Sequence, residues 1–238
     1  MKHLLLLALL AACGDDKGSS LDANIDMATN PPTKFVYLNF EGVTLTQGES
    51  SPSANTWPGQ TRTFGPFLET HPQRSAIIEG IVEKTRELLA PYDIGVESER
   101  PAEKYMMIVF TGLAENNGSI AGNAGDGGIQ CGLSANSSIV ATQYELSDDA
   151  TRSVEDVANI HMFLTVAEIG LAHGVVTVTE PGNCMCWNAV DCFNFDYYAN
   201  RCTIQGTVPI DTSVSQCPYT GTTIDISAEF LMKLKAHP

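Results

Sequence analysis

Basic residues are scarce in this chain of 238 residues. It contains 13 lysines and arginines against 28 aspartates and glutamates, which gives a formal net charge of −15 at pH 7. A surface this acidic repels phosphate groups, which argues against nucleic acid and against anionic lipid surfaces as partners. We expect the negative charge to keep the protein soluble outside the cytoplasm.

Motifs that define several common classes of enzyme are also missing. The chain has no Gly-x-Ser-x-Gly elbow, and its five histidines do not suggest a Ser-His-Asp arrangement. The stretch 112–132, rich in glycine and asparagine, has neither the Gly-Lys-Ser/Thr of a phosphate loop nor the regular oxygen ligands of an EF-hand. We therefore interpret 112–132 as a loop.

No segment of the sequence is long and apolar enough to cross a membrane as a helix. Leu4–Leu10 is itself too short to span a bilayer as a helix, and it follows a short basic start. The next residues, Leu10-Ala11-Ala12-Cys13, resemble the lipobox of bacterial lipoproteins, in which the cysteine becomes the lipidated first residue. The resemblance implies a signal peptide at 1–12 and a lipidated, flexible tether at 13–33. A plain secretory signal with an accidental cysteine is the alternative.

Lipidation at Cys13 also implies a location. Several acyl chains would hold the protein stably at a membrane, so the membrane itself is one expected partner. Glycine rather than aspartate follows the cysteine, which leaves sorting to the outer membrane open. We expect a lipid-anchored protein of the bacterial cell envelope, at the outer membrane or on the periplasmic face.

The cysteines beyond the lipobox indicate disulfide bonds. In an exported chain an even number of cysteines is typical of disulfides, and six cysteines form three at most. The sequence leaves their pairing open, although two of them are too close to pair comfortably with each other. A zinc knuckle is disfavoured because no Cys-x-x-Cys spacing occurs. The candidates are Cys131, Cys184, Cys186, Cys192, Cys202 and Cys217.

Hydrophobic periodicity predicts an α+β fold for a single globular domain at 34–238. A first strand, or a hairpin bent at Gly42, is expected at 34–45, and polar, cysteine-rich coil at 188–220. Other strands are expected at 93–98, 105–111 and 138–143, two long helices at about 74–89 and 153–173, and a last short helix at 227–235.

The helix at 153–173 and the turn after it carry the most unusual pattern in the chain. Ser153 can cap the helix, which is apolar on nearly every side and is therefore expected to be buried. Glu168 shares an apolar face with His161, seven residues earlier. A carboxylate in that position is expensive unless it is paired or hydrogen-bonded.

This stretch resembles the active-site helix of the zincin metalloproteases, specifically the metzincin pattern HExxHxxGxxH followed by a Met-turn. Without gaps, the family's glutamate aligns with Glu168, its glycine with Gly174 and the methionine of its Met-turn with Met185. The three zinc-binding histidines align with Ala167, Leu171 and Thr177. The resemblance implies a metzincin-like domain with a mixed sheet, in which Glu168 is a relic of the general base and every zinc ligand is absent.

Three hypotheses about function follow. The first is a catalytically inactive metalloprotease homologue, without metal or cofactor, whose cleft binds a peptide or protein. In the resembled family an edge strand lines that cleft, and 138–143 is expected to be this strand. The alternative is an active zinc-dependent peptidase with rearranged ligands, His161, Glu168 and His173. The third is a structural or interaction protein of unrelated α+β fold.

Overall fold

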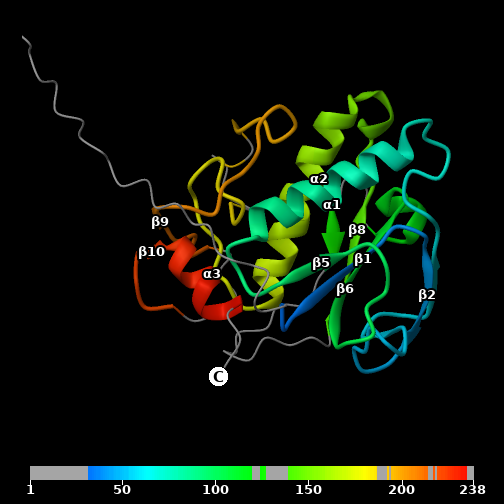
Figure 1. Ribbon diagram of the computed structural model, residues 1–238, viewed down its shortest axis with the longest axis horizontal. Coiled ribbons are helices and arrows are strands. Elements are labelled where there is room, and N and C mark those ends of the chain that lie inside the picture. The colour runs from blue at the N-terminus through cyan, green and yellow to red at the C-terminus, as the bar shows by residue number, and fades with distance from the viewer. Residues whose placement is uncertain are drawn as a thin grey trace, which may run out of the picture. The chain divides into compact units, whose positions relative to one another are not determined.

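A five-stranded sheet organises the chain from residue 32 onward (Figure 1). The computed structural model describes residues 32–119, 124–126, 139–186, 192, 194–213, 217 and 219–234, so the predicted signal peptide, Cys13, the tether up to residue 31 and Cys131 lie outside the described residues. The strands lie in the order β5 (Gly95–Glu97), β1 (Phe35–Asn39), β6 (Tyr105–Thr111), β8 (Val140–Tyr144) and β7 (Gly125–Asp126). The first four are parallel, and β7 pairs antiparallel with β8.

The central strand β6 is buried along its whole length, as the continuous apolar run YMMIVFT predicts. Its alternate residues point to opposite faces of the sheet. Met106, Ile108 and Phe110 belong to one hydrophobic cluster, and Met107 and Val109 belong to another. Both faces of the sheet are therefore covered.

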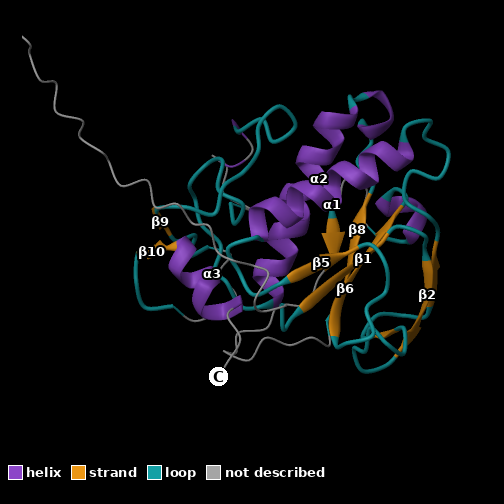
Figure 2. Cartoon of the chain, viewed as in Figure 1, coloured by secondary structure: helices purple, strands orange, loops and turns teal. Residues whose placement is uncertain are grey.

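Two long helices cover the face of the sheet that carries Met106, Ile108 and Phe110 (Figure 2). They are α1 (Arg74–Leu89) and α2 (Val154–Ala172), close to the predicted bounds. The helices approach tightly, because a Cβ added to Gly80 would lie 3.0 Å from Ala158 Cβ. No helix in the described ranges meets the length and hydropathy that a membrane span requires.

A second, three-stranded sheet covers the opposite face. Its strands are β3 (Thr56–Trp57), β2 (Val43–Gln47) and β4 (Arg62–Phe64), with β2 in the middle. Leu45 and Phe64 pack from this sheet onto Met107. The segment predicted as one strand or hairpin at 34–45 is thus divided between two sheets. The chain bends at Gly42, whose φ of 77° suits glycine, and an added Cβ there would lie 2.5 Å from the Phe64 carbonyl oxygen.

The edge of the main sheet differs from the prediction. The segment expected at the edge, 138–143, contains most of β8, which lies between β6 and β7. The edge strand is β7, inside the stretch interpreted as a loop at 112–132, which also holds the short 3₁₀ helix Ala114–Asn117. A two-residue strand carries no periodicity, so the sequence pattern alone gives no signal for it.

The C-terminal part is mostly coil with two small regular elements. Strand β9 (Thr207–Pro209) pairs with β10 (Thr223–Asp225), although coil was predicted throughout 188–220. Helix α3 (Ile226–Leu234) follows, so the described chain has three α-helices, two long and one short. A second 3₁₀ helix, Asp149–Thr151, precedes α2.

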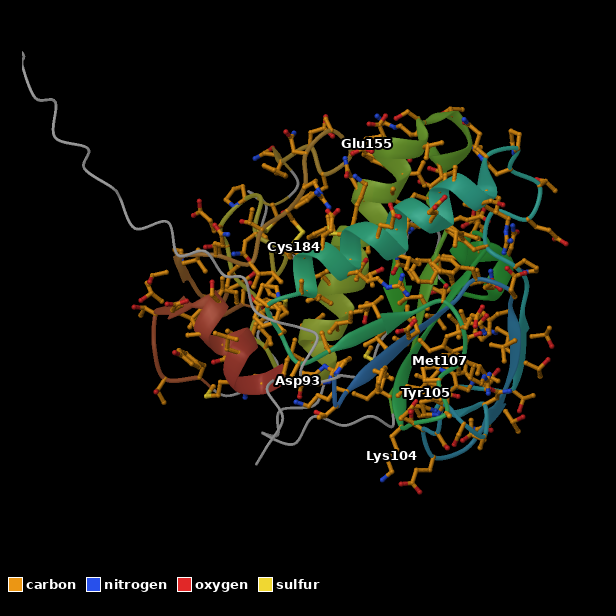
Figure 3. All side chains as sticks on the ribbon, in the orientation of Figure 1. Asp93, Lys104, Tyr105, Met107, Glu155 and Cys184 are labelled. Atoms are coloured by element: carbon orange, nitrogen blue, oxygen red, sulfur yellow. A yellow bond between two sulfur atoms is a disulfide. The ribbon has the colours of Figure 1, made fainter. Side chains whose placement is uncertain are left out.

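The expected disulfide framework is present in this part. Cys184 pairs with Cys202 and Cys186 with Cys192, with Cα–Cα distances of 5.0 and 5.5 Å. Cys217 is also disulfide-bonded. Figure 3 shows the bond at Cys184 in yellow. The bonds Cys184–Cys202 and Cys186–Cys192 fasten the coil that follows α2 to itself, where few hydrogen-bonded elements hold it.

Candidate functional site

Helix α2 begins and ends at the residues that its capping signals indicate. Ser153 Oγ accepts a hydrogen bond from the Asp156 backbone N–H at 3.1 Å, which closes the first turn. The last turn ends at His173, and Gly174 follows with a φ of 77°. These two ends fix the register of the helix, and with it the position of Glu168.

Met185 packs directly against α2. Its side chain is fully buried, and a Cβ added to Gly170 would lie only 2.5 Å from Met185 Sδ. Val178 N–H donates to the Met185 carbonyl at 3.0 Å, and Asn183 Oδ1 accepts the Met185 N–H at 2.9 Å. The turn that carries the methionine is therefore held beneath the C-terminal half of α2.

Glu168 faces the edge of the main sheet. Its side chain is 5% exposed. A Cβ added to Gly125 in β7 would lie 3.0 Å from Glu168 Oε1 and 2.7 Å from the Thr142 carbonyl oxygen. Glycine at 125 therefore allows the edge strand and the helix carboxylate to approach each other.

The three positions aligned with zinc ligands lie on α2 and on the segment after it. Ala167 is fully buried, Leu171 is partly buried and Thr177 is 4% exposed. Alanine and leucine offer no atom that binds a metal. Thr177 Oγ1 finds no hydrogen-bond partner within the described part of the chain.

His161 takes part in a buried polar network on another part of α2. Its Nε2 lies 2.7 Å from Asp149 Oδ2, and its Nδ1 lies 2.7 Å from Gln143 Nε2. The same Gln143 amide also donates to the His161 carbonyl, so the amide nitrogen is a donor to Nδ1 and the ring proton is assigned to Nε2. Thr165 Oγ1 donates to Gln143 Oε1 at 3.1 Å. Both ring nitrogens of His161 are thus occupied.

His173 is engaged differently. Its Nδ1 donates to the Ile169 carbonyl at 2.7 Å. Burial lowers the pKa of His173 below its ordinary 6.5, the Ile169 carbonyl raises it, and the charge of Lys34 lowers it further. Among the described residues, no group of three or more His, Cys, Asp or Glu side chains is placed to hold a metal ion. The alternative ligands His161, Glu168 and His173 are all described, and they do not converge in this structure.

A cavity of about 560 Å³ lies elsewhere, next to the end of β8. Leu68 forms one wall of the cavity, and its backbone φ of 47° is unusual for a residue other than glycine. The Leu68 N–H donates a hydrogen bond to Glu145 Oε1. Burial raises the pKa of Glu145, and the nearby Asp149 charge raises it further. The polar lining of this cavity includes Glu69, Thr70, His71, Thr111, Asn116 and Glu145.

Sequence reasoning missed several members of these groups. Thr142 and Gln143 are two consecutive polar residues in an otherwise apolar strand. This pattern could have indicated a buried polar network. Gly170, in the last turn of an apolar helix, was a signal of close packing. Asp149 gave none, because a carboxylate in a polar turn is ordinary.

The arrangement around Glu168 offers a buried carboxylate, an edge strand and a methionine beneath the helix. A carboxylate of this kind accepts hydrogen bonds from a ligand or a neighbouring backbone. An edge strand offers backbone groups to an extended peptide. Comparison of the chain with protein-family models, with curated proteins and with solved structures found no match.

Proposed function

We propose that this protein is a lipid-anchored binding protein of the bacterial cell envelope, built on a metzincin-like scaffold that has lost its zinc ligands. The observation that carries the proposal is the contact between α2 and Met185. In the resembled family the Met-turn lies beneath the zinc-binding helix, and here Met185 Sδ packs at Gly170, between the positions aligned with two of the zinc ligands.

The order of strands supports the same scaffold. Four parallel strands end in one antiparallel edge strand, β7, and Glu168 approaches this strand at Gly125. The family's substrate cleft lies between such an edge strand and the active-site helix. Loss of the ligands at Ala167, Leu171 and Thr177 leaves the cleft without the ion that activates water. Binding without hydrolysis is the function that this chemistry favours.

The ligand that fits is an extended peptide added as a strand along β7. Main-chain hydrogen bonds would supply affinity, and pockets for alternate side chains would supply selectivity. The chain's own charge of −15 favours basic peptides over acidic ones.

A peptide-binding experiment tests this function. The purified full-length chain is screened against a library of extended peptides, and each peptide that binds is remade with N-methyl groups on alternate backbone nitrogens. Methylation on the side that pairs with β7 should abolish binding, and methylation on the other side should leave the affinity within a few-fold. Every bound peptide should be recovered uncleaved. Equal tolerance of both methylation patterns, or cleavage of the peptide, would contradict the proposal.

The anchor has a separate test. Replacing the lipidated thiol by Cys13→Ser should move the protein from the membrane fraction to the soluble extracytoplasmic fraction, since no acyl chain remains to hold it. Metabolic labelling with a fatty acid gives the second readout, because the label should be lost with the thiol. A Cys13→Ser chain that stays at the membrane would show that another contact anchors it.

A further inference from the structure

Two buried oxygen atoms lack partners in the segment that follows α2. Thr177 and Asp211 are each 4% exposed. Within the described residues, Thr177 Oγ1 and Asp211 Oδ2 are among the few buried side-chain oxygens without a hydrogen-bond partner. Most buried polar atoms in folded proteins are paired, so two such atoms in one place point to a ligand.

The two residues face each other across a bridge. Val178 pairs antiparallel with Ile210, and Asp211 N–H donates to the Thr177 carbonyl at 3.0 Å. This register places Thr177 directly opposite Asp211. Side chains of directly opposed residues leave the same face of the pair, with Cβ atoms about 4.5–5.5 Å apart. The two unpartnered oxygens therefore belong to buried side chains on the same side of the pair.

The surroundings of Asp211 indicate what kind of ligand belongs beside the two side chains. Its Oδ1 accepts hydrogen bonds from Ser213 N–H at 3.0 Å and from Ser213 Oγ at 2.5 Å. In the part of the chain that the structure describes, no Lys, Arg or His forms an ion pair with Asp211. A buried carboxylate without a cation is more costly than a buried neutral group, so the expected partner carries positive charge.

We propose that Thr177 Oγ1 and Asp211 Oδ2 are two ligands of a bound hard cation, whose remaining ligands are backbone carbonyls and water. Both side chains offer oxygen, which suits Ca²⁺, Mg²⁺ or an alkali ion, whereas zinc prefers nitrogen and sulfur ligands. The cation would fasten the segment between α2 and the Met185 turn to the segment that follows β9. Thr177 is also one of the positions aligned with zinc ligands, but the proposal does not rest on the proposed function, because its grounds are the burial and the unpartnered oxygens of the two residues.

Thermal unfolding of the full-length chain tests the site. The chain is freed of metal with a chelator and then titrated with NaCl, KCl, MgCl₂ or CaCl₂ at constant ionic strength. One of these cations should raise Tm saturably, by roughly 5–10 °C at a concentration about a hundred times its Kd. Calorimetric titration with the same cation should give one site per chain. The other salts should leave Tm unchanged.

Three variants assign the effect to these residues. Asp211→Asn keeps the shape and removes the charge, and Thr177→Val keeps the shape and removes Oγ1, so each should abolish or strongly weaken the response. Glu103→Gln removes an exposed carboxylate and should leave the response unchanged. If Asp211→Asn does not fold, Thr177→Val carries the test.

Two results would overturn the proposal. One is a chain whose Tm stays the same in all four salts, which would mean that no cation binds at Thr177 and Asp211. The other is a cation response that survives both Asp211→Asn and Thr177→Val. Neither result depends on whether the chain binds peptides.

Discussion

Several polar side chains of this protein are buried in its interior. Glu168, His161 and Thr177 all come from the stretch 153–187, and all three are buried. The sequence could predict that Glu168 is buried, because the helix around it is apolar on nearly every side. It could not predict the partners of His161, because Asp149 and Gln143 come from other elements and are brought to it only by the fold.

At this scale, His173 makes stability depend on pH. Burial lowers the pKa of His173 below 6.5 in the folded chain. Near pH 6.5 the imidazole of the unfolded chain therefore binds a proton that the imidazole of the folded chain does not bind. The free energy of unfolding should therefore fall as the pH drops from about 6.5 to the folded pKa, and then level off. Urea unfolding between pH 7.5 and 5 measures it, and His173→Asn should remove this part of the pH dependence.

The contribution of His173 is the difference between the stability curves of wild type and His173→Asn. Taking this difference matters because other groups change the stability with pH in the opposite direction. Burial raises the pKa of Glu145 and of Glu229, so the folded chain holds protons there that the unfolded chain has released. Both carboxyls are present in wild type and in His173→Asn, and their effects cancel in the difference. Parallel stability curves for the two proteins would show that His173 does not titrate as described.

At the scale of elements, long periodic segments were predictable and short or paired ones were not. The two long helices and β6 follow their hydrophobic patterns closely, since each is long enough to show its period. Strand β7 has two residues, and β2 belongs to a different sheet from β1 although the two are nearly adjacent in sequence. Strand pairing depends on contacts between distant segments, which a local pattern does not contain.

The contact between α2 and the Met185 turn gives a prediction at this scale. A glycine-to-alanine change inside a helix usually stabilises it by about 1 kcal/mol. At Gly170 the new Cβ would lie 2.5 Å from buried Met185 Sδ, and overpacking of this kind costs about 1–3 kcal/mol. The cost exceeds the gain, so we expect Gly170→Ala to lower the free energy of unfolding in urea by up to about 2 kcal/mol.

Two further variants show whether that loss comes from the methionine. Gly65→Ala places its Cβ where no atom lies within 4 Å, so its effect should be small. Met185→Ala opens space for the new methyl group. The double variant Gly170→Ala, Met185→Ala should therefore lose less stability than the sum of the losses in the two single variants. Additive effects would mean that α2 and the Met185 turn do not press on each other at this point.

At the scale of the whole molecule, the fold joins two covered faces of one sheet to a disulfide-fastened C-terminal part. The class α+β was predictable from composition and periodicity. The arrangement around Glu168 was only implied by a resemblance of some twenty residues, because a site assembled from α2, β7 and the Met185 turn depends on how three elements meet. The central claim is that the positions aligned with zinc ligands still surround one point.

Restoring the imidazoles tests that claim most directly. The variant Ala167→His, Leu171→His, Thr177→His is titrated with zinc against a chromophoric chelator, and the double variants that lack one imidazole serve as controls that still report if the triple variant does not fold. If the three positions still surround one point, the triple variant should bind one zinc ion tightly per chain. The double variants should bind zinc more weakly, and wild type should bind none with comparable affinity. A folded triple variant that binds zinc no better than wild type would contradict the account.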